Sequence, residues 1–170
     1  MAIFKKPSLK TESKKKREMP QGLWQKCPGC GDVVHEIELV ENDRVCPRCD
    51  YHFAQPAKER IQNLLDADSF VEMDAGLKSV DVLRFQGMAN YKERLKTYQA
   101  RTGLLDAVIS GHGILDGYKV AIAVMDFGFL AATMGSVVGE RITRTIEYGT
   151  AEHCAVIIVA ASGGARMLVM

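Results

Sequence analysis

The chain has 170 residues, of which 47% are hydrophobic and 25% are charged, and its formal net charge is +1. This composition excludes the disordered and fibrous classes, and the length allows one ordinary domain plus a small module. No apolar run reaches the roughly 18 residues of a membrane span, and no apolar signal region opens the chain. We therefore expect a cytoplasmic protein that does not cross a membrane.

Residues 1–22 are predicted to form a basic, flexible arm. Lysines crowd this stretch, and its acidic residues are Glu12 and Glu18. The arm ends at Met19-Pro20-Gln21-Gly22, where proline and glycine interrupt regular structure. Such a run can bind nucleic acid or an acidic surface, but a solvated tail is the commoner explanation.

Residues 23–55 carry two C-x-x-C pairs, which predict a four-cysteine zinc ribbon. Cys27 pairs with Cys30 and Cys46 with Cys49, and residues 31–45 separate the pairs. This spacing is typical of one structural Zn²⁺, because four sulfur ligands leave no open position for water or substrate. Redox-active pairs are the alternative, but they usually occur singly at a helix start. His52 is a further side chain that could compete as a ligand.

Residues 56–103 are predicted to form a helical linker region. Ile61, Leu64 and Leu65 lie at helical spacing within 57–67, which indicates a short amphipathic helix after Pro56. Residues 69–73 have the pattern of a strand. A second helix follows, with an apolar face made of Tyr91, Leu95 and Tyr98. The ribbon itself is expected to contain short strands, such as residues 33–39.

Beyond residue 103 the pattern predicts two antiparallel strands, a helix and a third strand. The first two strands are expected at 106–110 and 118–126, and Asp116-Gly117 between them is a strong hairpin signal. The helix is expected at 137–148 with Ser136 as its cap. Residues 155–161 form an apolar run typical of a strand buried on both faces. The expected apolar stripe of the helix consists of Val138, Ile142 and Ile146.

The last predicted strand runs into Ser162-Gly163-Gly164-Ala165-Arg166, a glycine turn that we interpret as a candidate oxyanion hole. Backbone N–H groups at Gly163 and Gly164 could stabilise the negative oxygen that develops when a thioester loses its α-proton. The alternative is a tight turn in which glycine only satisfies a positive φ. The glycines of residues 134–139 match neither a P-loop nor a dinucleotide-binding fingerprint.

Four motifs in the same order resemble the β-subunit family of the bacterial and plastid acetyl-CoA carboxylase carboxyltransferase. They are the cysteine ribbon and the stretches 91–95, 134–139 and 162–167, so that the resemblance covers about residues 22–167. It implies an α/β fold in which the ribbon is followed by part of a crotonase-like ββα domain, here residues 104–170. In the family the chain continues well beyond the glycine turn, so the resemblance implies that roughly half of the catalytic domain is missing from this sequence.

The resemblance also implies an activity, a set of partners and roles for the glycine turn. Carboxybiotin on a biotin carboxyl carrier protein, charged by biotin carboxylase, would give its carboxyl group to acetyl-CoA and form malonyl-CoA. A separate α subunit would complete the site in a heterotetramer of two α and two β chains. Gly163 and Gly164 match the oxyanion-stabilising turn, and Ser162 and Arg166 are candidates for substrate binding. For Ser162 a helix cap and for Arg166 a structural ion pair are the alternatives.

Two other functions stay open from the sequence. A nucleic-acid-binding zinc module would use Arg44, Arg48 and the lysines of the arm to contact phosphates. A truncated, non-catalytic zinc-ribbon protein would keep the ribbon without the reaction. Activity of the 170-residue chain alone is not expected, because the apolar strand at 155–161 would keep an uncovered face.

Overall fold

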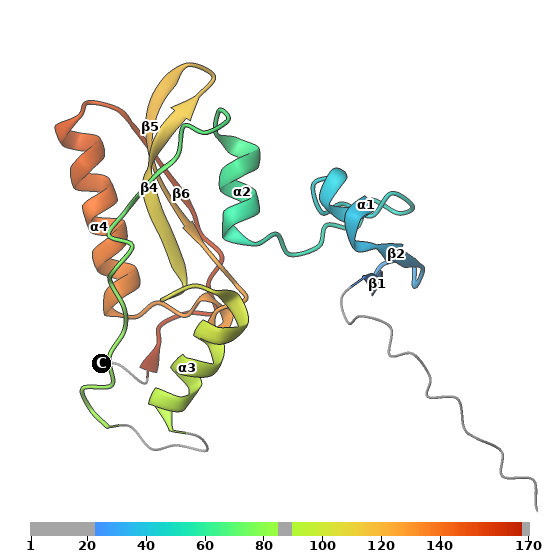
Figure 1. The fold of residues 1–170 in the computed structure, drawn as a ribbon, viewed down its shortest axis with the longest axis horizontal. Helices are drawn as coiled ribbons and strands as arrows, with labels where there is room; N and C mark the ends of the chain where they lie inside the picture. The colour runs from blue at the N-terminus through green and yellow to red at the C-terminus, as the bar shows by residue number, and fades with distance from the viewer. Residues whose placement is uncertain (1–22, 85–89, 168–170) are drawn as a thin grey trace, which may run out of the picture. The chain divides into compact units, whose positions relative to one another are not determined.

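The computed structural model describes residues 23–84 and 90–167 (Figure 1). The chain divides into two compact units, one up to Tyr51 and one from His52 onward, and each is described by itself. Among the described residues no helix is both long and apolar enough to cross a bilayer. The predicted arm, 1–22, lies outside the described residues.

The first unit is a small ribbon made of two strands and one short helix. Strands β1 (Trp24–Lys26) and β2 (Val33–His35) pair antiparallel, and helix α1 (Glu36–Glu41) follows at once. The strand expected over residues 33–39 is therefore wrong in its second half. The His35 side chain accepts a hydrogen bond from the backbone N–H of Ile37 and caps the helix. Acidic residues in the first turn also favour a helix there.

The second unit is built on a four-stranded sheet with the order β3-β4-β5-β6. The antiparallel hairpin of β4 and β5 turns at Asp116-Gly117, where φ is 49° and 82°. Two positive φ values are typical of a type I′ turn, so the predicted hairpin is confirmed. The strands are β3 (Val71–Met73), β4 (Val108–Leu115), β5 (Tyr118–Met125) and β6 (Ala155–Val159).

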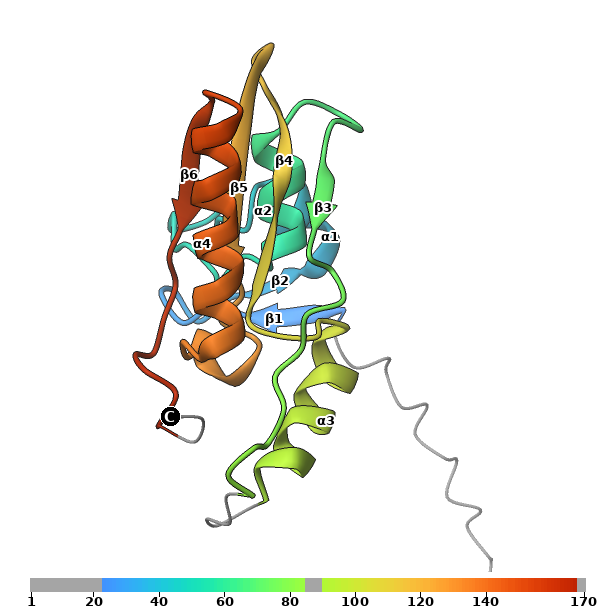
Figure 2. The same cartoon turned by 90° about the vertical axis from the view of Figure 1, so that its left-hand side faces the viewer.

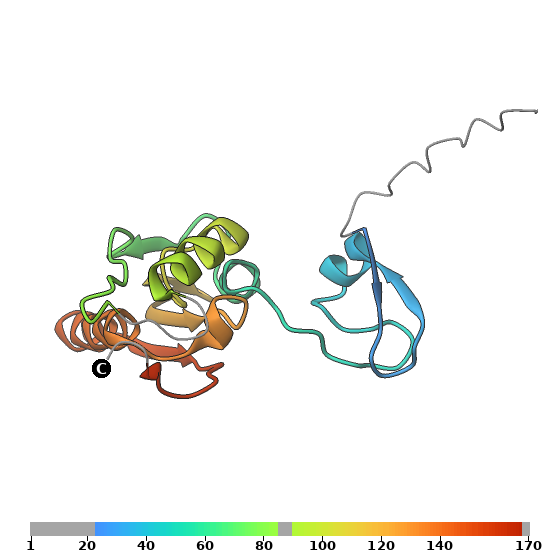
Figure 3. The same ribbon diagram turned by 90° about the horizontal axis from the view of Figure 1, so that it is seen from below.

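Helices cover both faces of this sheet. Helix α4 (Ser136–Ala151) connects β5 to the parallel strand β6 and lies on one face, and α2 (Ala57–Leu64) lies on the other (Figures 1 and 2). Seen from below, the strands lie between these two helices (Figure 3). The apolar side chains of α2, β4 and β5 form one core. This arrangement is the mixed α/β fold that the sequence predicts.

The region predicted as a helical linker contributes to the same core. Ala57 and Ile61 of α2 are buried in it, as are Tyr91 and Leu95 of α3 (Tyr91–Thr102). The Asn90 side chain caps α3 by accepting a hydrogen bond from the Lys92 N–H, and α3 ends at a left-handed glycine. Both predicted helices of this region are confirmed. The boundaries proposed at 23–55, 56–103 and 104–170 stay predictions.

Helix α4 differs from its predicted pattern in its cap and in its buried face. Gly135 takes the cap position without a side-chain bond, and Ser136 is the first helical residue, so the predicted cap is wrong. Val138 is buried, but Ile146 is 44% exposed, whereas Arg141 and Thr145 are buried. The buried face of the helix differs from the predicted apolar stripe because Arg141 has polar partners under the helix. It donates to Val108 O at 2.7 Å and to Ser110 Oγ at 2.9 Å.

Strand β6 pairs with β5 along one edge, and no described strand pairs with its other edge. Its side chains at Ile157 and Val159 pack against the core, but Val156 and Ile158 are 37% and 42% exposed. The prediction that the strand is buried on both faces is therefore wrong for this chain. The uncovered apolar face expected for residues 155–161 is confirmed over the strand itself.

Candidate functional site

The four cysteines of the ribbon come together at one point. All four Sγ atoms lie within 4.8 Å of one another, with Cys27 and Cys49 3.6 Å apart and Cys30 and Cys46 3.9 Å apart. The backbone N–H of Gly29 donates to the Cys27 sulfur at 3.3 Å, as expected for a tight turn around a thiolate.

The donor set and its spacing fit a tetrahedral zinc ion. Zinc–sulfur bonds of about 2.3 Å in a regular tetrahedron place the sulfurs about 3.8 Å apart, close to the two distances above. Cys27, Cys30, Cys46 and Cys49 would hold the ion, and the grouped ligands include cysteines only, not His52. With four sulfurs around it the ion supplies structure, not Lewis-acid chemistry.

The thiols perturb one another strongly. Desolvation raises the pKa of Cys27, but the backbone N–H groups of Cys30 and Gly29 and the neighbouring thiols lower it to about 7. A backbone N–H at Tyr51 lowers the pKa of Cys49, yet desolvation and the other three thiols raise it to about 12. Four thiolates at this spacing repel one another, so a divalent cation is needed to keep all of them deprotonated together.

The arginines of the ribbon are engaged in ion pairs within the ribbon. Arg44 is 8% exposed and donates to Glu36 Oε1 at 2.5 Å. Arg48 lies 3.8 Å from Asp32 Oδ2. A buried and neutralised guanidinium cannot contact a phosphate without leaving its partner. This arrangement removes Arg44 from the set proposed for nucleic-acid binding.

The glycine turn lies at the carboxyl edge of the sheet. Strands β5 and β6 are parallel, so the segments that follow them meet at one edge. There Met134, which leads into α4, forms a parallel bridge with Ala165 of the turn. Met134 N–H donates to Gly164 O at 2.9 Å, and Arg166 N–H donates to Met134 O at 2.7 Å. Open α/β sheets commonly bind their ligands at this edge.

The two candidate amides of the turn have different partners. Gly163 N–H donates to Ala131 O at 2.8 Å, whereas Gly164 N–H donates to the exposed Ser162 hydroxyl at 3.0 Å. An exposed hydroxyl can be displaced by a substrate oxygen more easily than a backbone carbonyl held in a bridge. Gly164 also has a φ of 103°, which favours glycine. Of the two amides, the one at Gly164 thus has the more easily displaced partner, and its role toward a ligand stays a prediction.

Arg166 lies under the turn in a buried ion pair with Asp106. The two residues are 3% and 0% exposed, and Arg166 Nη2 lies 2.8 Å from Asp106 Oδ1. The same guanidinium donates to the hydroxyls of Ser79 and Tyr91 and to the carbonyl of Thr133. Burial opposes its charge, but the hydrogen bond and charge of Asp106, with Tyr91, raise the pKa of Arg166. The structure thus favours the ion-pair alternative for Arg166, and its substrate-binding role stays a prediction.

The loop between β5 and α4 contains an unusual backbone. Leu130, Ala131 and Ala132 have φ values of 47°, 54° and 50° in succession. The left-handed region costs an L residue about 1–2 kcal/mol, and three in a row are rare. The turn η1 (Leu130–Ala132) touches the glycine turn through the bond between Gly163 N–H and Ala131 O.

Two buried carboxylates near the carboxyl edge of the sheet were not among the site residues predicted from the sequence. Asp106 accepts from Arg166, Ser79 and the Ala107 N–H, and Asp126 accepts from the N–H groups of Ala57 and Gly128. Both residues flank apolar strands, where a carboxylate needs a partner to be buried. A carboxylate next to an apolar strand therefore indicates a buried group with a partner. The position does not identify that partner, which for Asp106 is 60 residues away.

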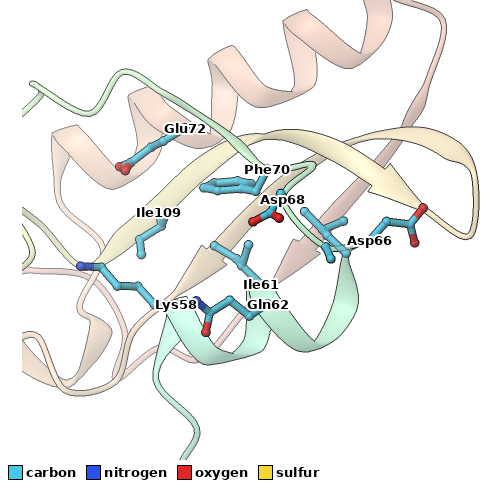
Figure 4. Close-up of a pocket in the computed structure, with 10 residues that line it drawn as sticks. Lys58, Ile61, Gln62, Asp66, Asp68, Phe70, Glu72 and Ile109 are labelled. Atoms are coloured by element: carbon cyan, nitrogen blue, oxygen red, sulfur yellow. The ribbon is translucent and has the colours of Figure 1, made fainter.

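A cavity of about 560 Å³ lies apart from the glycine turn, between α2 and the start of β3. Figure 4 shows its lining, where apolar side chains of Ile61, Phe70 and Ile109 are accompanied by carboxyl groups of Asp66 and Asp68. Lys58 and Glu72 also line it. An excess of carboxylates repels the phosphates of a coenzyme A. The cavity contains none of the predicted site residues.

Comparison with known families gives two matches along the chain. Residues 24–49 match the acetyl-CoA carboxylase zinc finger domain, and residues 54–169 match the carboxyl transferase domain. The first match contains the four cysteines, and the second contains the sheet and the glycine turn.

Curated relatives agree with these matches. The chain is 45% identical over 161 residues to the acetyl-CoA carboxylase carboxyl transferase subunit beta of Synechocystis sp., covering 95% of this chain and 49% of that protein. It is 50% identical over 150 residues to the chloroplastic subunit of Chlorella vulgaris, covering 88% and 36%. The chain thus spans about half or less of the length of these relatives.

Solved structures share the fold. The transcarboxylase 12S with hydrolysed methylmalonyl-coenzyme A bound gives a TM-score of 0.54 at 27% identity over 68% of this chain and 20% of that chain. The same enzyme with methylmalonyl-coenzyme A and methylmalonic acid gives 0.52 at 25%, with the same coverage. Because the domain match includes more than half of its residues, the chain belongs to the carboxyl transferase family.

Proposed function

We propose that the chain acts as a carboxyltransferase β subunit of acetyl-CoA carboxylase, with acetyl-CoA as the carboxyl acceptor. The observation that supports this most is the glycine turn at the carboxyl edge of the parallel pair β5 and β6. Among the described residues, its Gly164 amide donates to an exposed hydroxyl, that of Ser162. Relatives that are 45% and 50% identical over most of this chain bear this subunit name.

The chemistry follows from where charge develops. Loss of a proton from the methyl group of acetyl-CoA places negative charge on the thioester oxygen, and a preorganised amide stabilises that oxygen without reorganisation. The Gly164 N–H is the donor that we assign to it, and Gly163 supports the turn through Ala131. The α-proton passes to the ureido nitrogen from which carboxybiotin releases CO₂, and the enolate carbon forms a bond with that CO₂, which gives malonyl-CoA. When the thioester oxygen takes the Gly164 N–H, the Ser162 hydroxyl that accepts it in the structure is released and can contact the substrate.

The partners proposed for this reaction are other proteins. An α subunit would supply the carboxybiotin side of the site in a heterotetramer of two α and two β chains. A biotin carboxyl carrier protein and biotin carboxylase would deliver the carboxyl group. Four reduced cysteines fit a reducing compartment, so we propose the cytoplasm, although the relative from Chlorella vulgaris is chloroplastic.

The test is reconstitution with these partners. The chain is mixed with an α subunit, carrier protein, biotin carboxylase, ATP and bicarbonate, and malonyl-CoA is measured by mass spectrometry. Formation that depends on both acetyl-CoA and this chain supports the proposal. If no malonyl-CoA forms and acetyl-CoA does not bind, the non-catalytic alternative is favoured. Binding to RNA or DNA that weakens steeply with salt and ignores acetyl-CoA would favour the nucleic-acid alternative.

A further inference from the structure

The left-handed turn Leu130–Ala132 needs an external support. None of its three residues is glycine, and each has a φ near 50°. An L residue in this region brings its Cβ close to the following carbonyl oxygen. Such backbone persists only where surrounding contacts fix it, and it occurs preferentially at functional sites.

Leu130 and Ala132 are buried in the core, and Ala132 N–H and Thr133 N–H donate within the turn to Phe129 O and Leu130 O. The described polar contacts that reach this turn from another segment come from the glycine turn opposite. Gly163 N–H donates to Ala131 O at 2.8 Å. Arg166 Nη2 donates to Thr133 O at 2.8 Å, and Arg166 Nε donates to Thr133 Oγ1 at 3.1 Å. One arginine thus holds the residue that directly follows the left-handed turn by both its carbonyl and its hydroxyl.

Asp106 sets the orientation of this arginine. Its two carboxylate oxygens accept from Nη2 at 2.8 Å and from Nη1 at 3.3 Å, a forked geometry that a guanidinium matches and an ammonium does not. Ser79 and Tyr91 accept from Nη1 at 3.1 and 3.2 Å. With both charges buried, the guanidinium has no exposed edge to offer a substrate.

We infer that Arg166, held by Asp106, is a positioning residue that clamps the left-handed turn against the glycine turn and thereby fixes the Gly164 amide. It acts through the backbone and does not touch the substrate. The effect on carboxyl transfer rests on the proposed function, but the clamp itself does not. The two can therefore be tested separately.

The first measurement is the exchange of the Gly163 amide hydrogen in the chain, followed by NMR. Arg166→Lys keeps the charge but loses the fork, so protection of Gly163 should fall about tenfold or more. In the assembled enzyme, kcat should fall about 100-fold with KM for acetyl-CoA within about twofold, because misplacement of a donor affects the transition state. Arg141→Lys, in another buried arginine away from the turn, is the control and should leave Gly163 protection unchanged.

The second measurement is a rescue. Glycine adopts the left-handed region without a Cβ penalty, so Ala131→Gly with Ala132→Gly should make the clamp less necessary. In the Arg166→Lys background the two glycine substitutions should raise both Gly163 protection and kcat about fivefold. In the parent the same substitutions should change each of them by less than about twofold, because the energetic effects of residues in contact are coupled. Asp116→Gly relieves a φ of 49° in the hairpin instead and should rescue neither.

Three results would overturn the inference. The first is unchanged Gly163 protection in Arg166→Lys. The second is a rise in the KM of Arg166→Lys for acetyl-CoA that Ala131→Gly with Ala132→Gly does not reverse. The third is a rescue by Asp116→Gly as large as the rescue by Ala131→Gly with Ala132→Gly. The second result would assign Arg166 to substrate binding. If even the parent assembly forms no malonyl-CoA, the proposed function fails, and amide protection alone still decides whether the clamp exists.

Discussion

Asp106 carries a full charge in a position without solvent contact, and its acceptor capacity is taken by Arg166, Ser79 and the Ala107 N–H. A pair of this kind adds little stability compared with apolar residues of equal volume. Removal of one partner, however, leaves the other charge buried and uncompensated. The pair therefore fixes a geometry and makes the residues around it intolerant of single changes.

Asp106→Asn keeps the shape of the side chain and removes its charge. We expect the free energy of unfolding to fall by about 3 kcal/mol, because the Arg166 guanidinium is left buried without a counter-charge. Urea unfolding followed by circular dichroism measures the change. Asp68→Asn, at an exposed residue, is the matched control and should alter stability by less than about 0.5 kcal/mol. Equal effects of the two substitutions would contradict the argument.

At the scale of elements, helix α4 contains two glycines in opposite surroundings. A Cβ added at Gly139 meets no atom of the described residues within 4 Å, whereas one added at Gly149 lies 2.3 Å from Val156 Cγ2 in β6. Gly149 thus lets the helix and the strand approach each other closely. Against the part of the chain that the structure describes, Gly139 makes no such close contact, and glycine weakens a helix relative to alanine.

The same substitution should therefore have opposite signs at these two positions. Gly139→Ala is expected to raise the free energy of unfolding by about 1 kcal/mol through helix propensity. Gly149→Ala is expected to lower it by about 1–3 kcal/mol, because the added methyl group overpacks the contact with β6. Thermal unfolding of the two variants beside the parent checks both signs. Stabilisation by both would mean that α4 and β6 are not in contact.

Elements whose signals are local could be predicted from the sequence. The β4–β5 hairpin follows from Asp116-Gly117, and α3 follows from the helical spacing of Tyr91 and Leu95. Features that depend on contacts between residues far apart in the chain could not be predicted in this way. The buried face of α4 includes Arg141, whose partner Glu72 is 69 residues away, and no period of apolar residues reveals this. The exposure of β6 likewise depends on what lies beside it in space, which its apolar run cannot indicate.

The candidate site divides in the same way. The four cysteines are identified by spacing within two short turns. The glycine turn is a candidate from its sequence and stays a prediction as a site. The different partners of Gly163 and Gly164 cannot be read from that sequence, because Ala131 is brought there by the parallel crossover. The network of Arg166 joins residues 33 to 87 positions apart in the chain. No local pattern encodes such contacts.

At the scale of the whole molecule, the two units differ in what holds them together. Buried apolar side chains of the ribbon are few, chiefly Val34 and Leu39, apart from its buried cysteines. A core of this size cannot offset the conformational entropy of the ribbon, so the metal must supply the difference. The second unit has an extended core of its own.

Removal of zinc should therefore unfold the ribbon and leave the second unit folded. Trp24 is the single tryptophan of the chain and lies in the ribbon. Its ring is edge-on to that of His35, with 4.7 Å between the ring centroids. Its fluorescence should change with excess chelator, while most of the far-ultraviolet circular dichroism remains. Cys46→Ser should abolish zinc binding in a metal assay, and Cys154→Ser, outside the ribbon, should not. Unchanged Trp24 fluorescence after complete removal of the metal would contradict this prediction.

The buried pair of Asp106 and Arg166 also restricts how the sequence can drift. A single replacement at either position creates an unpaired charge in the interior. Few single substitutions could therefore lead from this ion pair to another pair of residues without a loss of stability. We expect the two positions to change together during divergence or not at all, despite the 60 residues between them. Ser79, which contributes a neutral hydroxyl to the same group, should vary more freely.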